Sequence, residues 1–407
     1  MSSGAAPLSS LRVGAVYFDG TNNVTGRDRT IMSLETGWAS ISGGKARRIS
    51  SVHDLPSDVI WYTNLDFAQF IRVGLGRHAN FRNAEWLRTQ FHGLIAELGI
   101  GADNLPPHEM ISVLAQVAQR VVKHAQERYG VTLSHNKLNQ DFSEALQVPR
   151  CAFPNEFYPV IPTIAQHPAV KVVHTNNYHQ SSPTITVRCN RLQHARALLS
   201  TPVPSDMGWE MENPSSLKKR SEDWLDSLDT PFLVKVSVAN VQPMVSDVLS
   251  WSSGAKAPRE WLTDTEWRLF RQFADITIKA ALICRLPATR LEVYDQLPDE
   301  HMAELSLTYG LLAEQMWTAF TNPMPYRLNE TRWSVAAAWL RAADRLRMFD
   351  FAQKLHARGL TVSSYGVGSV VLRYPASGGL QRTLAMASET GLLPPAKGMA
   401  QAARGAA

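Results

Sequence analysis

Apolar residues recur at helical spacing in several stretches of this chain. Between residues 104 and 130, prolines precede the apolar positions and Gly130 follows them, as is typical of a helix start and a helix end. The apolar positions fall on one side of a helix: Ile111, Leu114, Ala115, Ala118, Val122, Ala125 and Tyr129. The pattern therefore predicts a helix with one buried face.

The C-terminal half has three further stretches of this kind. Thr263 and Glu266 form a capping-box pattern, and the apolar positions after them predict a helix that reaches Cys284. Asp299 opens a second predicted helix, which ends before Pro323. The third stretch, from residue 333 to residue 358, predicts the longest helix of the three.

The 333–358 helix is predicted to have two different sides. Asp350 lies three residues after Arg347 and four before Lys354, which favours a surface ion pair worth about 0.3–0.5 kcal/mol. We interpret the helix as apolar inward and basic outward. Its inward positions are Trp333, Ala336, Ala337, Leu340, Ala343, Met348, Phe351 and Leu355.

Short runs rich in β-branched residues predict strands between these helices. Residues 25–57 show little periodicity and are predicted to be loop, whereas residues 58–98 are predicted to be helical in two pieces. The fold class is therefore mainly α with minor β, with a mixed α/β N-terminal half and a helix-rich C-terminal half. The predicted strands are Val13–Phe18, Val170–His174, Thr184–Cys189, Phe232–Val241 and Val370–Tyr374.

The chain has 407 residues, enough for two or three domains with cores of their own. We expect a mixed helical and β region at 1–204, a polar linker at 205–230, a basic helical domain at 231–395 and a mobile tail at 396–407. The start of the sequence lacks a secretory signal pattern, and no apolar run reaches the length of a membrane span. We therefore expect an intracellular protein that does not enter a membrane.

Positive charge gathers toward the end of the chain. The net charge is +5, yet residues 327–358 alone carry seven basic and three acidic residues, and residues 359–407 carry four basic and one acidic. The first 326 residues are thus slightly negative. This asymmetry favours a polyanionic partner near the C-terminus. Eleven tryptophans favour buried contacts between subunits.

Several short motifs suggest chemistry, and none of them is complete. Asp19-Gly20-Thr21 resembles the opening of a hydrolase family related to the type VI secretion phospholipases, but the chain has no Gly-x-Ser-x-Gly elbow, so a plain turn is favoured. Gly43-Gly44-Lys45 lacks the first glycine and the final Ser or Thr of a phosphate-binding loop, which leaves a flexible basic loop.

Metal and thiol chemistry receive no better support from the sequence. His108-Glu109 has no second histidine one turn later, and His174 with His179 has no evident third ligand. Three cysteines show neither disulfide nor zinc spacing, and nothing in their spacing recommends Cys151 or Cys189 as a nucleophile. We predict no catalytic, cofactor-binding or metal-binding residues.

Phe349-Asp350-Phe351 resembles the Phe-Asp-Phe signature in coat proteins of flexuous filamentous plant and fungal viruses. The layout before it is similar too, with a helix that contains Trp317 and a proline-broken loop at 322–325. The resemblance implies a helical core that clamps RNA, in which an upstream arginine holds the aspartate; here the corresponding region, 304–306, has no arginine. The chain also resembles partitivirus capsid proteins, by fold-level analogy alone.

These observations predict a viral coat or nucleocapsid protein, located in the virion and the host cytoplasm. It would self-assemble into a large homo-oligomer and package RNA, with neither a cofactor nor enzymatic activity. Two alternatives stay open: a hydrolase that uses the Asp19 turn, and a nonviral nucleic-acid-binding accessory protein. The predicted phosphate contacts, which would not read sequence, are Arg341, Arg345, Arg347, Lys354, Arg358 and Arg373.

Overall fold

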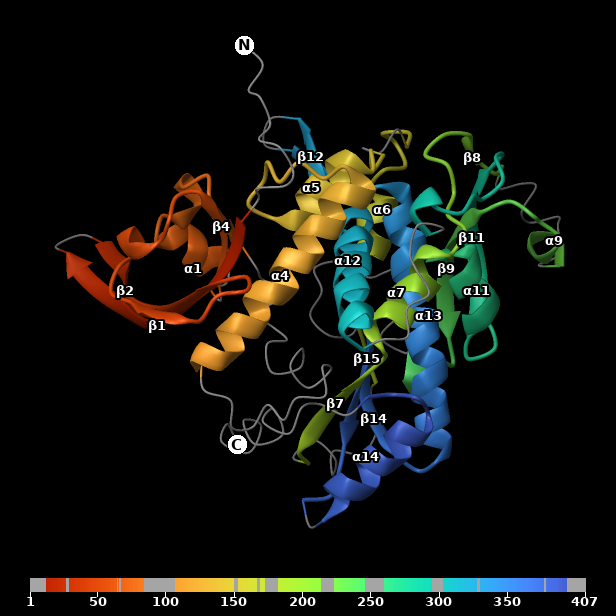
Figure 1. Ribbon diagram of the computed structural model, residues 1–407. Helices are drawn as coiled ribbons and strands as arrows, with labels where there is room; N and C mark the ends of the chain where they lie inside the picture. Colours follow the sequence, from red (N-terminus) through yellow and green to blue (C-terminus); the bar gives the residue numbers. More distant parts are fainter. Residues whose placement is uncertain are drawn as a thin grey trace. The chain divides into compact units, whose positions relative to one another are not determined.

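The protein has a mixed α/β fold, seen in a computed structural model (Figure 1). Of the residues that the structure describes, 42% are helical and 27% lie in strands. The chain forms two compact units, the first built from residues 1–147 and 298–316 and the second from 148–297 and 317–395. The described residues are 12–26, 29–63, 65, 67–83, 107–149, 153–166, 169–172, 182–213, 223–245, 260–294, 303–327, 330–376 and 378–393.

A five-stranded sheet with the order β3-β2-β1-β4-β5 forms the centre of the first unit. The long hairpin of β1 (Arg12–Gly26) and β2 (Arg29–Ile41) continues into β3 (Arg47–Ile49), all antiparallel. By contrast, β4 (Val59–Thr63) and β5 (Phe81–Asn83) run parallel to β1. The sheet is therefore mixed, and its direction of pairing changes at β1.

Helices cover this sheet. The α4 helix (Pro107–Tyr129) packs against β1 and β2 through its predicted apolar face, all of which is buried, and Gly130 follows it with φ of +66°. The unit also contains α1 (Phe67–Arg72), α5 (Leu138–Ala145) and two short 3₁₀ turns, Val52–Asp54 and Leu75–Arg77. A core under the sheet is built from Val16, Phe18, Ala39, Ile49, Leu55, Val59, Trp61, Leu65, Phe70, Leu75 and Phe81.

One close contact fixes β1 against β4. Gly14 of β1 pairs with Trp61 of β4, and a Cβ atom at position 14 would lie only 2.5 Å from the indole ring. Trp61 is fully buried, and its Nε1 donates to the backbone oxygen of Pro56 at 3.0 Å. Glycine is therefore needed at position 14 because the indole occupies the space that a side chain would take.

The second unit contains two antiparallel four-stranded sheets. In the first, with the order β10-β9-β11-β8, the longest pairing joins β9 to β11. In the second the order is β6-β14-β15-β7, and β14 and β15 form a tight hairpin. The strands are β6 (Ala169–Lys171), β7 (Thr184–Arg188), β8 (Trp209–Met211), β9 (Phe232–Ala239), β10 (Trp261–Thr263), β11 (Asp275–Cys284), β14 (Thr361–Gly366) and β15 (Ser369–Arg373).

The α13 helix (Val335–Ala357) is central to this unit, because it packs against α6, α7, α11 and strands of both sheets. A small hairpin of β12 (Met324–Arg327) and β13 (Glu330–Arg332) precedes it. The α12 helix (Ala303–Thr321) belongs to the first unit up to Met316. The other helices are α6 (Val160–Ala165), α7 (Arg191–Leu199), α9 (Asp223–Asp226), α11 (Asp264–Phe270) and α14 (Gly379–Glu389), with a 3₁₀ turn at Glu292–Tyr294 and another at Pro243–Val245.

Several sequence predictions are confirmed. The predicted long helices correspond to α4, α12 and α13, although Asp299, the expected start of α12, lies outside the described residues. The predicted strands correspond to β1, β6, β7, β9 and β15. The division at the 205–230 linker stays a prediction; its described part contains β8 and α9. No described helix has the length and apolar character to cross a membrane.

Other predictions are wrong. The helix expected to run from Thr263 to Cys284 ends at Phe270, and Asp275–Cys284 is strand β11, whose β-branched residues suit a sheet. Residues 25–57 contain β2 and β3 in place of loop, and residues 59–63 form β4 in place of helix. The fold is therefore mixed α/β, and not mainly α.

Candidate nucleic-acid interface

The predicted phosphate contacts lie mostly on α13, and Arg345 is the most buried of them. Its side chain is 1% exposed and forms an ion pair with Glu266, which is also fully buried, at 2.8 Å between Nη2 and Oε1. Its Nη1 also donates to the backbone oxygen of Ile164 at 3.3 Å. Arg345 therefore joins α13, α11 and α6 inside the second unit.

Arg341 and Arg347 are also partly buried. The Arg341 guanidinium stacks over the Trp317 ring at 4.4 Å and its Nη2 lies 3.5 Å from Asn322 Oδ1. Burial lowers the pKa of Arg341 to about 10, which is still high enough to keep it charged at neutral pH. Arg347 is half-buried, with its guanidinium 5.7 Å from the centre of the Phe351 ring.

The remaining predicted contacts lie nearer the surface. Lys354 is exposed and pairs with Asp350 at 2.6 Å, which confirms the predicted surface pair. Arg358 is exposed and pairs with Glu389 of α14 at 2.9 Å. Arg373 on β15 is half-buried. The role of all six residues in phosphate binding stays a prediction. The six differ in exposure, since Arg345 is buried whereas Lys354 and Arg358 are exposed.

The prediction that α13 is apolar inward and basic outward is wrong in one respect. Two charged residues of the helix, Asp344 and Arg345, are buried and do not face outward. Each has a partner from a distant part of the chain, which satisfies its charge inside the core. Helical spacing cannot show such partners, because it reports only the positions on one helix.

Asp344 binds the turn between β14 and β15. Its Oδ2 accepts the backbone N–H of Val367, and its Oδ1 accepts the N–H of Gly368 at 2.9 Å. His194 of α7 places Nε2 at 2.9 Å from the same Oδ1. One fully buried carboxylate therefore connects α13, α7 and the hairpin turn. No sequence signal marks this group, since 150 residues separate His194 from Asp344.

The hairpin turn has an unusual backbone. Val367 has φ of +52° and Gly368 has φ of +65°, the paired positive values of a tight two-residue turn. A β-branched residue rarely adopts this conformation, so the two N–H bonds to Asp344 stabilise a strained turn. The Val367 side chain is 47% exposed at the tip.

The described cysteines are not activated thiols. Cys189, at the end of β7, is partly buried with its Sγ 4.0 Å from the sulfur of Met348, and burial raises its pKa to about 12. Burial also raises the pKa of Cys284. Thiols in such surroundings stay protonated and are poor nucleophiles at neutral pH. Cys151, His174 and His179 lie outside the described residues.

Asp19 lies within β1, not in the turn that the sequence predicted, because the strand continues to Gly26 through a bulge beside Gly20. Its carboxylate accepts hydrogen bonds from Arg48 and from Thr36 Oγ1. The bond from Arg48 lowers the pKa of Asp19. No described serine or histidine contacts it, so the geometry gives no support to a hydrolase at this position.

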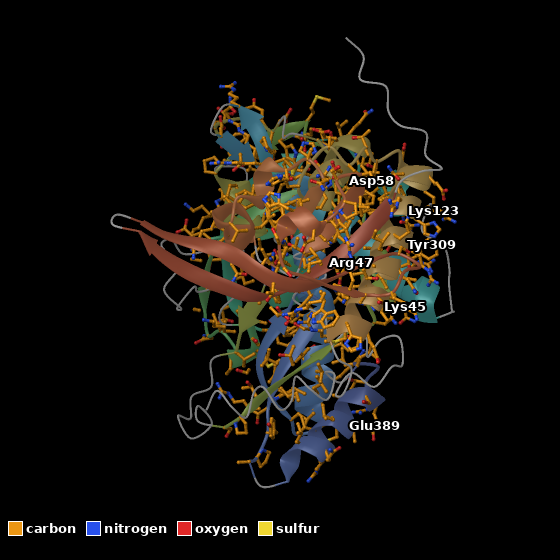
Figure 2. All side chains as sticks on the ribbon, turned by 60° about the vertical axis from the view of Figure 1, so that its left-hand side comes forward. Lys45, Arg47, Asp58, Lys123, Tyr309 and Glu389 are labelled. Carbon is orange, nitrogen blue, oxygen red and sulfur yellow. The ribbon has the colours of Figure 1, made fainter. Side chains whose placement is uncertain are left out.

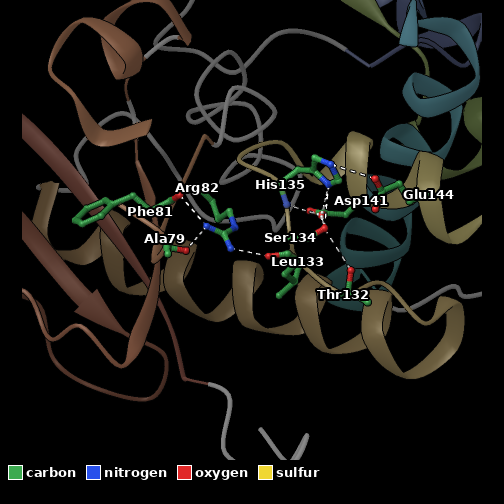
Figure 3. A network of polar contacts seen from close by, with 9 residues as sticks. All are labelled: Ala79, Phe81, Arg82, Thr132, Leu133, Ser134, His135, Asp141 and Glu144. Carbon is green, nitrogen blue, oxygen red and sulfur yellow. Dashed lines mark hydrogen bonds and ion pairs between the residues drawn. The ribbon is translucent and has the colours of Figure 1, made fainter. Parts of the chain in front are cut away.

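A polar network holds the segment after α4 in the first unit (Figure 3). Asp141 is 2% exposed, and its Oδ1 lies 2.8 Å from the backbone N–H of His135 and 3.0 Å from His135 Nδ1. Burial raises the pKa of Asp141, against the lowering effect of these bonds. Arg82 donates to the backbone oxygen of Leu133 at 2.6 Å, so β5 is tied to the same segment.

No known family model matches this chain, and no curated protein matches it either. Solved structures do resemble it. Phi29 DNA polymerase, complexed with primer-template DNA in a post-translocation binary complex, has a TM-score of 0.51 at 12% identity, over 92% of this chain and 82% of the polymerase. The fold of this chain therefore resembles that of Phi29 DNA polymerase. Phi29 DNA polymerase with single-stranded DNA scores 0.49 at 11% identity, over 92% and 82%, which is too low to add support.

This likeness corrects the functional prediction from the sequence. The prediction of a viral coat or capsid protein is wrong, because the fold resembles that of Phi29 DNA polymerase and no family or curated match supports a capsid. The predictions of RNA packaging and of self-assembly depended on the capsid prediction, and the comparisons do not support them. The expectation that the protein has no enzymatic activity finds no support in the fold, because Phi29 DNA polymerase, whose fold is similar, is an enzyme. The Phe349-Asp350-Phe351 motif is accounted for by a buried Phe349 and the surface pair of Asp350.

Polymerases hold two metal ions with carboxylates, so the fold raises the question of a metal site. Among the described residues, no group of three or more His, Cys, Asp or Glu side chains is arranged to hold a metal. Asp344, the carboxylate at the hairpin turn, is fully buried and already accepts three hydrogen bonds. Since the described residues show no such group, we derive no metal-dependent step from them.

Proposed function

We propose that this chain binds DNA through its polymerase-type fold. The observation that carries the proposal is the likeness to Phi29 DNA polymerase in complex with primer-template DNA, which covers 92% of this chain. The likeness extends over nearly the whole chain and is not confined to one domain. The alternative of a nucleic-acid-binding protein, left open by the sequence, is closest to this proposal.

Charge supports the proposal. The net charge of +5 favours a polyanion over a neutral or cationic partner. Of the predicted phosphate contacts, we propose Lys354 and Arg358 for this role, because their side chains are 58% and 40% exposed. Each pairs with a surface carboxylate, and such pairs are weak enough for a phosphate to compete.

The proposal concerns binding and not nucleotidyl transfer. Transfer in polymerases depends on metal ions held between carboxylates and substrate phosphates. Among the described residues, no group of three or more His, Cys, Asp or Glu side chains is arranged to hold a metal, so transfer is left out of the proposal. Contacts from the protein to DNA phosphates need only cationic side chains and N–H groups, and they do not depend on the DNA sequence.

Fluorescence anisotropy tests this proposal. A labelled primer–template duplex and a labelled single strand are titrated with the full chain over a series of salt concentrations. We expect binding at about 50 mM salt that weakens linearly on a logarithmic salt scale, as counterion release requires. The absence of binding to both DNAs at this salt concentration would contradict the proposal.

Two charge variants refine the assay. Lys354→Gln together with Arg358→Gln should weaken binding and reduce the salt slope by about two, one for each lost phosphate contact. The matched control is Lys123→Gln, a lysine of α4 that is 62% exposed and belongs to the first unit. Equal affinities for the double variant and the control would remove Lys354 and Arg358 from the interface and leave DNA binding itself intact.

A further inference from the structure

We propose that a pocket in the first unit binds the 5′-phosphate and the base of a nucleotide, either free or at the end of a DNA strand. If the ligand is the end of a DNA strand, the inference rests on the proposed DNA binding. If the ligand is a free nucleotide, the inference is independent of that proposal. The pocket lies where β1 begins and β2 ends, and its volume is about 740 Å³. This is within the usual range for small-molecule sites, roughly 300–1,000 Å³.

Cations form the polar part of the pocket. Arg12, Lys45 and Arg47 line it, and none of the residues that line it is acidic. Arg12 pairs with Asp58 at 2.7 Å, outside the lining. Among the described residues, no carboxylate forms an ion pair with Lys45 or Arg47. The pocket therefore presents positive charge that a phosphate can neutralise.

Arg47 is held in position without being neutralised. Its Nη2 donates to the backbone oxygen of Asp54 at 2.6 Å. The Asp54 carboxylate is engaged elsewhere, because its Oδ2 accepts the backbone N–H groups of Ser50 and Ser51 at 2.8 and 2.9 Å. The Asp54 carboxylate attracts the Arg47 charge without forming an ion pair with it, and a guanidinium held by one such bond keeps further N–H donors for a ligand.

The loop between β2 and β3 leaves its backbone accessible to a ligand. Gly43 and Gly44 both line the pocket, and Gly43 has φ of +79°. A Cβ atom at Gly43 would meet nothing within 4 Å, so the space beside this loop is open. Because both residues lack side chains, a phosphate can approach the loop more closely than it could in a sequence without glycine.

The wall of the pocket is apolar, which distinguishes a nucleotide from inorganic phosphate. Ile41 and Pro56 are the partly exposed residues of this part, whereas Ala39 and Trp61 are buried. The Trp61 ring is held against Gly14 by packing and by its bond to the Pro56 oxygen, so the wall is rigid. An apolar wall beside cations fits a ligand with a flat apolar body and one charged end.

Figure 2 labels Lys45 on the loop after β2 and Arg47 on β3, and it also labels Lys123 on α4. The first two line the pocket and Lys123 does not. Lys123 is a matched control because it carries the same charge on the same unit and pairs with Glu127 of its own helix, at 3.9 Å.

Isothermal titration calorimetry on the full chain tests the inference with deoxyadenosine 5′-monophosphate and deoxyadenosine as the two probes. We expect the monophosphate to bind at least about tenfold more tightly, because charge-assisted hydrogen bonds to phosphate are the strong contacts. Equal binding of the two probes, or no binding of the monophosphate, would overturn the inference. This comparison uses the wild-type chain and needs no variant.

The variants locate the site. Lys45→Gln with Arg47→Gln should weaken monophosphate binding at least about tenfold, and Lys123→Gln should leave it unchanged. Both pocket residues are exposed, so the double variant should keep the wild-type circular dichroism spectrum. Wild-type affinity in the folded double variant would place the ligand elsewhere and overturn the inference.

A second arm separates the two sources of the phosphate. Matched oligonucleotides with a 5′-phosphate or a 5′-hydroxyl are compared by anisotropy. A preference for the 5′-phosphate that the double variant loses supports a strand end, whereas equal affinities restrict the site to free nucleotides. If neither oligonucleotide binds, the proposed DNA binding fails, and the monophosphate titration still decides the inference on the pocket.

Discussion

Two groups of cations in this protein differ in what surrounds them. On α13, Arg345 and Arg341 lie inside the second unit, one paired with Glu266 and the other stacked on Trp317. In the first unit, Lys45 and Arg47 are exposed at a pocket without acidic residues. The stretch with the larger net charge in the sequence thus places part of its cations inside the protein.

The difference shows that charge counted along a sequence and charge offered at a surface are separate quantities. A buried cation must be matched by a partner because desolvation is costly, so its charge is used within the protein. An exposed cation beside glycines has no such requirement. The following changes test this comparison, beginning with the largest expected effect.

Arg345→Met should lower the free energy of unfolding by about 3–5 kcal/mol, because it leaves the Glu266 carboxylate buried and unpaired. Urea denaturation followed by circular dichroism measures the loss. The double variant Arg345→Met with Glu266→Gln keeps the helix cap and removes both charges, so it should recover most of the stability. A single variant as stable as the wild type would mean that this pair is not buried in solution.

Asp344→Ala should cost about 3 kcal/mol, since His194 and the N–H groups of Val367 and Gly368 lose their acceptor. Amide hydrogen exchange provides a local measurement. Exchange should accelerate at Val367 and Gly368 more than in the middle of β9. Uniform acceleration throughout the second unit would indicate general destabilisation and contradict a local role for Asp344 in holding the turn.

Asp264 should make stability depend on pH. Burial raises its pKa to about 6, although Trp339 Nε1 donates to its Oδ1 at 2.9 Å. The folded state therefore holds a proton that the unfolded state has lost, so this residue's contribution falls as pH rises from about 4 to about 6. The loss is on the order of 3 kcal/mol. Asp264→Asn should be more stable relative to the wild type at pH 7 than at pH 4, and an equal difference at both pH values would contradict this.

The smallest effects should come from exposed cations. Lys354→Ala removes a surface pair and should change the free energy of unfolding by no more than about 0.5 kcal/mol. Lys45→Gln with Arg47→Gln should also change it little, because both side chains are exposed. Thermal melting of both variants measures this. A loss above about 2 kcal/mol in the pocket variant would show that its cations support the fold.

Local patterns in the sequence predicted the elements that depend on local interactions. The α4 helix follows its apolar spacing from Ile111 to Tyr129, and the capping box of Thr263 and Glu266 is present in α11. Both signals act within one or two turns of a helix, so they do not depend on the rest of the chain. The same locality explains the correct pairing of Asp350 with Lys354.

The failures arise where distant residues decide the structure. Residues 275–284 join a sheet because β9 and β8 lie on either side of them, and helical periodicity read from the sequence cannot include those neighbours. The pairs Arg345–Glu266 and His194–Asp344 join residues 79 and 150 positions apart. The functional prediction is wrong for the same reason, because neither the charge asymmetry nor the number of tryptophans in the sequence reports how distant segments form the sheets.

The packing of Gly14 against Trp61 restricts how these two positions can change during evolution. A side chain at position 14 would collide with the indole, and a smaller residue at position 61 would open the wall of the pocket. A substitution at one position is therefore tolerated only after a change at the other. In relatives that keep the pocket, we expect the two positions to vary together, with glycine retained wherever tryptophan is retained.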